Sequence, residues 1–430
     1  MKTFAIATLG CKVNTYESES YVVGMKNLGY TEVDFQLLAD IYIINTCAVT
    51  NTASSKSRQK INHAKRLNPN AFICVVGCYA QMNPAYISDT MGIDLLLGST
   101  NKKELPNLID ECIKEKRKVN MVTDINHHLD FEEISVANFH HLTRAFLKIQ
   151  DGCNQFCSYC IIPYVRGEER SLAPDKVIAT AQELVNNHHL EIVLAGIHTG
   201  RYGHEHNYTL TKLLKRMLVE VHGIKRIRIS SIEISEISDE LISLIKEEDR
   251  IAKHLHIPLQ SGSDNTLKAM NRPYNLQQFK SAITKIRTEI PNINISSDVI
   301  VGFPCESNED FKDTCNTCNE VGFSFMHVFP YSKRDGTQAA SLPNQLDNNI
   351  KKERGKLLGD LSLKLYNDYK ASFIGKHVSV LVETASNNQS IGHSSEYLRV
   401  IINTELKKGE LYDVLVTDLI NQDLIAVMEE

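Results

Sequence analysis

Apolar runs alternate with helical patterns along the first 120 residues. Strand-like runs occupy Phe4–Leu9, Ile41–Thr46, Phe72–Val76 and Asp94–Leu97, with helical patterns between them at Tyr16–Leu28, Ser54–Leu67 and Pro84–Met91. Alternation of this kind predicts a parallel sheet with crossover helices. We therefore expect residues 1–120 to form a doubly wound α/β domain.

Strand patterns alternate with helical patterns again between residues 139 and 370, with six strands in all. The predicted strands are Ala145–Gln150, Glu191–Ala195, Arg226–Ser230, Lys253–Ile257, Ile295–Val301 and Phe325–Phe329. Helical patterns separate them at Pro174–Asn187, Leu210–Val221, Asp239–Glu247, Leu276–Glu289 and Asn308–Val321. Six such units predict a partial barrel related to the (β/α)8 type, with its site at the carboxyl ends of the strands.

Residues 371–430 change to short alternating strands. These are His377–Glu383, Tyr397–Asn403, Tyr412–Asp418 and Leu424–Met428, with turn residues between them. The pattern predicts a small antiparallel β-barrel, a fold that often binds oligonucleotides. From Gly375 onward, however, the chain has four Lys or Arg and nine Asp or Glu residues. We therefore expect no general electrostatic attraction of this barrel to nucleic acid.

The composition is that of an ordinary globular protein. The chain has 430 residues, of which 42% are hydrophobic and 23% charged, and its net charge is −5. Its apolar runs are shorter than the roughly 18 residues that a membrane span needs, and the N-terminal run is too short for a targeting signal. Eleven cysteines in such a chain predict metal ligands or buried thiols in a reducing cytoplasm. Neither a membrane nor DNA is expected as a partner.

One predicted helix is strongly basic. Residues 51–70 contain no Asp or Glu, and their cations are Lys56, Arg58, Lys60, Lys65 and Arg66. The segment is either a solvated helix face or a patch that contacts phosphates.

Three cysteines of the first domain occupy equivalent positions. Cys11, Cys47 and Cys78 each come just after a predicted strand. Ligands of a doubly wound sheet bind at the carboxyl ends of its strands, so these thiols could meet in space. The alternative is three unrelated buried cysteines. We favour a three-thiolate site.

Three further cysteines directly follow the first barrel strand. Cys153, Cys157 and Cys160 have the spacing Cys-x3-Cys-x2-Cys. A mononuclear zinc site normally has four ligands, and so does an electron-carrying cubane. Three thiolates on a four-iron cube leave one iron open to a ligand that is not protein. The spacing therefore indicates cluster chemistry at the barrel mouth.

Polar residues and glycines recur at the other strand ends of the barrel. They include Gly196, His198, Ser231, Glu233, Gln260 and Asp298. Glycine permits close backbone approach, and these polar side chains hydrogen-bond hydroxyls and amines. Each could serve a turn alone, but their joint recurrence favours a small-molecule pocket.

With these motifs, the chain resembles the radical S-adenosylmethionine methylthiotransferases over nearly its whole length. The segments Thr8–Asn14, Asn45–Cys47 and Gly77–Gln81 resemble the cluster-binding segments of that family's first domain. The segment Asp151–Pro163, followed by Arg166-Gly167, resembles its radical signature. The C-terminal barrel is similar to the family's TRAM domain.

The resemblance implies two 4Fe–4S clusters and S-adenosylmethionine as cofactors. Cys153, Cys157 and Cys160 would hold the cluster that binds S-adenosylmethionine and yields a 5′-deoxyadenosyl radical. Cys11, Cys47 and Cys78 would hold an auxiliary cluster that delivers sulfur, and a second S-adenosylmethionine would supply the methyl group. An electron donor and a sulfur source are implied as partners.

The form Gly10-Cys11-Lys12-Val13-Asn14 is most similar to one tRNA-modifying branch of the family. That branch adds methylthio to carbon 2 of N6-threonylcarbamoyladenosine, beside the anticodon, so the anticodon stem-loop is the implied partner. Other branches act on isopentenyladenosine or on an aspartate of a ribosomal protein. A non-catalytic iron–sulfur RNA-binding protein is the alternative from another class.

The family also implies roles for the remaining candidates. Tyr159 and the turn Gly196–His198 would flank the adenine and amino group of S-adenosylmethionine. Methionyl or ribose contacts would come from Ser231, Glu233, Gln260 and Asp298. Arg166 and Arg170 would pair with tRNA phosphate or with the threonyl carboxylate.

Overall fold

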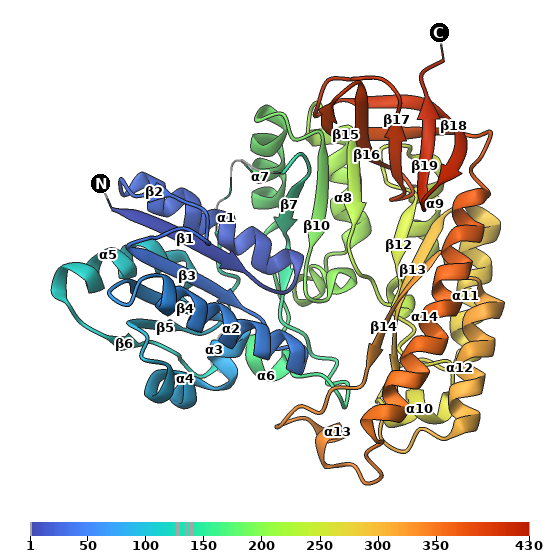
Figure 1. The fold of residues 1–430 in the computed structure, drawn as a ribbon. Helices are drawn as coiled ribbons and strands as arrows, with labels where there is room; N and C mark the ends of the chain where they lie inside the picture. The colour runs from blue at the N-terminus through green and yellow to red at the C-terminus, as the bar shows by residue number, and fades with distance from the viewer. Residues whose placement is uncertain (1, 126–129, 135, 137–138, 140–141, 430) are drawn as a thin grey trace.

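The computed structural model describes residues 2–125, 130–134, 136, 139 and 142–429. Three units follow one another along the chain: a parallel sheet flanked by helices, a half-open barrel of parallel strands, and a small closed barrel (Figure 1). This arrangement confirms the predicted fold class.

The first unit is a six-stranded parallel sheet with strand order β2-β1-β3-β4-β5-β6. Its strands are β1 (Thr3–Thr8), β2 (Thr31–Glu32), β3 (Ile41–Thr46), β4 (Phe72–Gly77), β5 (Leu95–Leu97) and β6 (Val119–Asn120). Its helices are α1 (Lys12–Asn27), α2 (Asn51–Leu67), α3 (Cys78–Met82), α4 (Pro84–Met91), the 3-10 turn η1 (Lys102–Glu104) and α5 (Leu105–Glu115). Every residue of β3 is buried because apolar clusters cover both faces of the sheet. The strand order reverses between β1 and β3, so their carboxyl ends border a crevice.

The second unit contains six parallel strands in two hydrogen-bonded groups, β7-β10-β11 and β12-β13-β14. They are β7 (Ala145–Lys148), β10 (Glu191–Ala195), β11 (Arg226–Ile229), β12 (His254–His256), β13 (Asn294–Val301) and β14 (Phe325–Pro330). Isolated bridges such as Ser231 to His256 join the groups into one curved wall. The helices are α6 (Ile162–Arg166), α7 (Pro174–Asn186), α8 (Leu210–Glu220), α9 (Asp239–Glu247), α10 (Asp264–Ala269), α11 (Leu276–Glu289), α12 (Asn308–Val321), α13 (Gln338–Ser341) and α14 (Asn348–Ala371).

Shorter elements connect these strands and helices. They are the hairpin of β8 (Gln150–Asp151) and β9 (Arg170–Ser171), and the 3-10 turns η3 (Thr199–Arg201), η4 (His204–His206) and η5 (Ile234–Glu236).

Helix α14 was not predicted from the sequence. It runs along the end of the half barrel at β14, where the Ser362 hydroxyl bonds both the N–H and the carbonyl of Met326 (2.9 and 3.0 Å) (Figure 1). Its buried side chains include Lys351, Arg354 and Lys370, so the helix lacks the apolar stripe that marks a typical surface helix. Among the described helices, none is long and apolar enough to cross a membrane.

The third unit is a closed barrel with strand order β15-β16-β17-β19-β18. Its strands are β15 (His377–Ser386), β16 (Gln389–Ser394), β17 (Arg399–Ile402), β18 (Leu411–Ile420) and β19 (Asp423–Val427). The sequence predicted four of these five strands. The pattern did not predict β16, because that strand is mostly polar and contains a glycine. Glycine is needed at position 392, where a Cβ would lie 1.9 Å from the Leu381 carbonyl oxygen.

Two arginines fasten the closed barrel to the amino ends of the central strands. Arg226 and Arg228 of β11 flank the carboxylate of Glu191 at 3.0 and 2.7 Å, and all three side chains are buried. Arg228 also donates to the carbonyls of Ser394 and Ser395 (3.0 and 2.9 Å). Burial raises the pKa of Glu191, but the two guanidinium groups outweigh this and hold it at about 2. The interface therefore depends on a buried ion cluster.

Replacing Arg228 by Met should destabilise the protein by about 3 kcal/mol, because it removes one partner of a buried ion pair. The matched change Arg399→Met removes a pair with Asp423 on the barrel surface and should cost less than about 1 kcal/mol. Chemical denaturation followed by circular dichroism measures both. Equal losses in the two variants would contradict a stabilising role for the buried cluster.

Candidate functional site

The loop after β8 carries Cys153, Cys157 and Cys160. Its entry requires glycine, because Gly152 has φ +73° and a Cβ there would lie 1.8 Å from the Glu168 carbonyl oxygen. The Cys153 N–H donates to the Gly167 carbonyl (3.0 Å), and the Cys160 N–H donates to the Cys157 carbonyl (2.9 Å). These bonds fix the loop at the carboxyl end of β7, where the sequence placed it.

The three thiols of this loop lie within electrostatic reach of one another. Burial, followed by the nearby Cys157 and Cys153, raises the pKa of Cys160 to about 12. The Sγ of Cys157 accepts a bond from the Arg272 guanidinium (3.2 Å), and the Sγ of Cys153 lies 3.4 Å from Nδ1 of His198. A bound metal centre replaces the thiol protons and compensates thiolates held this close together.

The second set, Cys11, Cys47 and Cys78, converges at the β1–β3 crevice. A Cβ on Gly10 would lie 2.9 Å from the Cβ of Cys47, so Gly10 allows the two loops to touch. Burial raises the pKa of Cys47 to about 11, with Cys78 and Cys11 adding to the increase. The expectation that three strand-end thiols approach one another therefore agrees with the structure. Cys74 and Cys112 are buried in the core of the sheet instead.

Among the described residues, no three Cys, His, Asp or Glu side chains are grouped so that they could hold one metal ion. A four-iron cube binds each thiolate at a different corner, so its ligands stand farther apart than those of one ion. The donor sets, three thiolates each, fit iron–sulfur clusters with one open iron.

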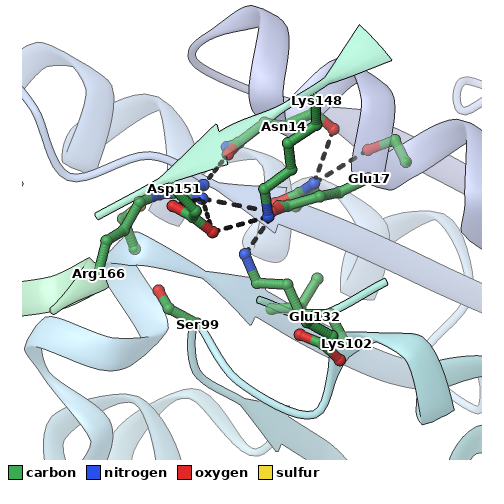
Figure 2. Close-up of polar contacts among 12 residues, drawn as sticks. Asn14, Glu17, Ser99, Lys102, Glu132, Lys148, Asp151 and Arg166 are labelled. Atoms are coloured by element: carbon green, nitrogen blue, oxygen red, sulfur yellow. Dashed lines mark hydrogen bonds and ion pairs between the residues drawn. The ribbon is translucent and has the colours of Figure 1, made fainter. Parts of the chain in front are cut away.

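A buried ionic network connects α1 of the first domain with β7, β8 and α6 of the second, and Figure 2 shows its side chains. The carboxylate of Glu17, on α1, contacts Lys102 at 2.7 Å, Lys148 at 2.9 Å and Arg166 at 3.2 Å. Asp151, two residues before Cys153, contacts Lys148 at 2.7 Å and Arg166 at 3.0 Å. Burial raises the pKa of Asp151, but these cations outweigh it and hold the pKa well below its usual range. Both carboxylates therefore stay ionised inside the protein.

Arg166 is the residue through which the network reaches the thiols. Its Nε donates to the Sγ of Cys78 (3.3 Å), and its Nη2 donates to the side-chain oxygen of Asn14 (2.6 Å). The network contains four cations, Lys102, Lys148, Arg166 and Arg170, against the carboxylates Glu17 and Asp151. The excess positive charge beside Cys78 suits thiolates that have lost their protons.

The expected role of Arg166 and Arg170 in binding phosphate or the threonyl carboxylate is wrong for this structure. Arg166 is completely buried, and Arg170 is 6% exposed. Arg170 donates to the carbonyls of Arg166 and Glu168 (2.8 and 2.9 Å) and contacts Asp151 at 3.3 Å. The guanidinium N–H groups of both arginines bond protein groups, because Arg166 and Arg170 are enclosed between the first two domains.

Two of the predicted strand-end residues, Gln260 and Asp298, line one pocket at the barrel mouth with Tyr159 of the cysteine loop. Tyr159, Gln260 and Asp298 share it with Val49 and Thr50 of the first domain. Its remaining walls are Ile300, Phe329, Pro330, Tyr331 and Ser332. The pocket is therefore built from both domains and borders the loop of Cys153, Cys157 and Cys160.

The other strand-end candidates do not line this pocket. Glu233 forms an ion pair with Arg272, and Nε2 of His198 lies 2.7 Å from Oε1 of Glu236. Gly196 lies at the end of β10, where a Cβ would come within 3.0 Å of Thr199. Ser231 pairs with His256 across the junction of the two strand groups. Their predicted contacts to S-adenosylmethionine stay predictions.

Sequence reasoning missed two arginines of the site. Arg272 contacts the Sγ of Cys157 and lies 3.5 Å from the Tyr159 hydroxyl. Arg334, in the loop after β14, donates to the Val49 carbonyl (3.3 Å) and to the side-chain oxygen of Asn51 (2.8 Å). Both are single residues in loops, so no spacing or periodicity distinguishes them in the sequence.

The basic helix α2 presents part of its charge to solvent. Lys56, Lys60 and Arg66 line one surface hollow together with His63, Leu9, Gln36 and Gln59. Arg58 instead donates to the Tyr79 hydroxyl (3.2 Å). Lys65 lies beside Gly92, where a Cβ would be 2.9 Å from its Nζ. The hollow therefore contains three of the five predicted cations.

Comparisons with known proteins follow the same division of the chain. Residues 3–98 match the model described as uncharacterized protein family UPF0004, and residues 147–318 match the radical SAM superfamily. A Bacillus subtilis protein named threonylcarbamoyladenosine tRNA methylthiotransferase MtaB is 45% identical, over 96% of this chain and 93% of its own length. An Aquifex aeolicus protein of the same name is 38% identical, over 88% of this chain and 92% of its own length.

The chain is also similar to a protein named for a different tRNA nucleoside and to a solved structure. A Clostridium tetani protein named tRNA-2-methylthio-N(6)-dimethylallyladenosine synthase is 35% identical, over 98% of this chain and 95% of its own length. The radical S-adenosylmethionine methyltransferase TsrM from Kitasatospora setae has a similar fold, with a TM-score of 0.58 at 12% identity over 79% of this chain and 76% of its own. That last likeness concerns the fold alone.

Substituting Met for Arg166 should impair both cysteine loops, because the side chain bonds Cys78, Asn14, Glu17 and Asp151 together. We expect lower iron content of the purified protein and parallel losses of S-adenosylmethionine cleavage and methylthio transfer. Iron analysis and chromatography of 5′-deoxyadenosine measure these. The control Arg216→Met removes only exposed ion pairs with Asp175 and Glu220. Loss of transfer with cleavage intact would restore a substrate-binding role.

Proposed function

Because this chain belongs to the radical S-adenosylmethionine methylthiotransferases that modify tRNA, we propose that its substrate is N6-threonylcarbamoyladenosine beside the anticodon, which it methylthiolates at carbon 2. The observation that supports the reaction type is the presence of two three-cysteine sets in adjoining domains, with Thr50, near Cys47, and Tyr159, between Cys157 and Cys160, lining one interdomain pocket. The substrate assignment is supported by the MtaB relatives, which are named as threonylcarbamoyladenosine tRNA methylthiotransferases.

The cysteines have separate roles in this proposal. Cys153, Cys157 and Cys160 would hold the 4Fe–4S cluster that binds S-adenosylmethionine, and Cys11, Cys47 and Cys78 would hold a second one. When bound, the two clusters would supply an electron for S-adenosylmethionine cleavage and sulfur for insertion. S-adenosylmethionine would also donate the methyl group. Cofactors of this kind provide the radical chemistry, and the protein positions the reacting groups.

The protein residues around the pocket would orient the reactants. Tyr159 would flank the adenine of S-adenosylmethionine, and Gln260 and Asp298 would contact its methionyl or ribose groups. The apolar side chains of Ile300 and Phe329, which line the same pocket, would exclude water from it. Arg272, held by Glu233, would fix the Cys157 thiolate by a charge-assisted hydrogen bond. A closed, dry site limits side reactions of a radical with solvent.

Nucleoside analysis tests the substrate and the cysteine roles together. Deleting the gene should remove methylthio-threonylcarbamoyladenosine from tRNA and leave threonylcarbamoyladenosine, as measured by mass spectrometry. A gene with Cys47→Ala should fail to restore the methylthio group while the purified variant still cleaves S-adenosylmethionine, because only the second set is broken. Cys157→Ala should lose both activities.

The exposed Cys305 lies outside both sets, so Cys305→Ala serves as the control and should restore the modification fully. Loss of the isopentenyladenosine derivative instead would reassign the substrate. An unchanged amount of methylthio-threonylcarbamoyladenosine in the deletion strain would contradict the proposed function.

The hollow on α2 is the proposed contact with the tRNA backbone. Lys56 is exposed, and Lys60 and Arg66 accompany it on the same surface, whereas the C-terminal barrel carries excess negative charge. Phosphates bind such cation clusters through counterion release, so binding should weaken with salt.

Reversing two charges of this hollow, Lys56→Glu with Lys60→Glu, should weaken binding of the anticodon stem-loop by at least about tenfold in a filter-binding or anisotropy assay. The matched reversal Lys352→Glu with Lys356→Glu alters exposed lysines with the same spacing on α14. It should leave binding nearly unchanged. A larger loss from removing residues 375–430 than from the α2 reversal would assign the main contact to the C-terminal barrel.

A further inference from the structure

Lys12, beside the second cysteine set, lies near ionisable groups of several strands of the half barrel. It follows Cys11 and is the first residue of α1, a helix that packs against β7. Its ammonium group lies within electrostatic reach of Arg228, Arg144 and Glu191, which come from different central strands or their amino ends. His254 of β12 and His327 of β14 also sense its charge. Lys12 therefore lies within electrostatic reach both of Cys11 and of residues on several strands of the half barrel.

The carboxylates near this lysine are already bound by other cations. Glu191 is held by Arg226 and Arg228. Glu383 of the C-terminal barrel pairs with Arg144 at 2.8 Å and lies 3.1 Å from His393. On the mouth side, Asp298 lies 3.3 Å from His256.

Lys12 itself has no partner in the part of the chain that the structure describes: neither a hydrogen bond nor an ion pair is formed by its ammonium group. The side chain is only partly exposed. A cation withdrawn from water without a counterion is costly, and here the nearest guanidinium groups repel it. An anionic ligand that entered the barrel would remove both costs.

We infer that Lys12 binds the carboxylate of the substrate's N6-threonylcarbamoyl group and so sets the preference for this nucleoside. The inference rests on the proposed function. If carbon 2 of the adenine faces the two cysteine sets, the N6 substituent leaves the ring in another direction, and Lys12 is the unpaired cation beside Cys11. The threonyl carboxylate is an anion that adenosine and isopentenyladenosine lack. The methionyl carboxylate of S-adenosylmethionine is the other source of the same chemistry.

Binding measurements separate these sources without requiring turnover. Two anticodon stem-loops would be compared by fluorescence anisotropy in the absence of S-adenosylmethionine: one with threonylcarbamoyladenosine, the other with its threonyl carboxylate converted to an amide. The wild-type protein should prefer the carboxylate by about tenfold, as for a hydrogen bond to a charged group. Lys12→Met should abolish this preference and leave affinity for the amide unchanged, whereas Lys12→Arg should keep most of it.

The exposed Lys103 of the same domain gives the matched control, Lys103→Met, which should behave as wild type. Equal weakening with both RNAs would assign Lys12 a structural role and overturn the inference. An unchanged RNA preference with weaker binding of S-adenosylmethionine would assign the lysine to the methionyl carboxylate and also overturn it. If the wild-type protein modifies only isopentenyladenosine RNA, the proposed function fails; if it modifies threonylcarbamoyl RNA and Lys12→Met keeps the preference, only the inference about Lys12 fails.

Discussion

The buried ion network around Glu17 and Asp151 is the constraint on which the site depends. It ties α1 of the first domain to the cysteine loop of the barrel, with Arg166 bonding carboxylates and the Cys78 thiol at once. Breaking a buried pair of this kind costs about 3–5 kcal/mol, because the remaining charge cannot be solvated. Such a network favours one relative placement of the two cysteine sets and penalises others.

A second set of contacts limits rotation between the same domains. Arg334, which follows β14, donates to the Val49 carbonyl and to the side chains of Asn51 and Ser54, a few residues after Cys47. The interdomain pocket borders these contacts because Val49 also lines it, together with Thr50 and Tyr159. Chemistry that must join a radical, a sulfur atom and one carbon of a base requires this fixed geometry, since small misplacements are costly in rate.

The placement of cysteines could be read from the sequence because their context is local. Cys11 and Cys78 follow a strand and a glycine, and Cys153, Cys157 and Cys160 occupy one loop. By contrast, β16 and α14 escaped prediction because polar residues or glycine occupy most of their buried positions, so neither has a clear apolar periodicity. Arg166 was recognised as part of a motif, but its role was misassigned because a motif does not reveal which groups enclose it.

The sequence by itself determined the order of the three units, the cluster-type cysteine spacing and the family resemblance, since these depend on periodicity and short motifs. Only the tertiary structure decided which charges are paired. Glu17 and Arg166 are 149 positions apart yet in contact, while Lys12, beside a predicted ligand, has no partner among the described residues. Pairing of charges depends on distances between remote segments and on exclusion of water, and both arise only when the chain has folded.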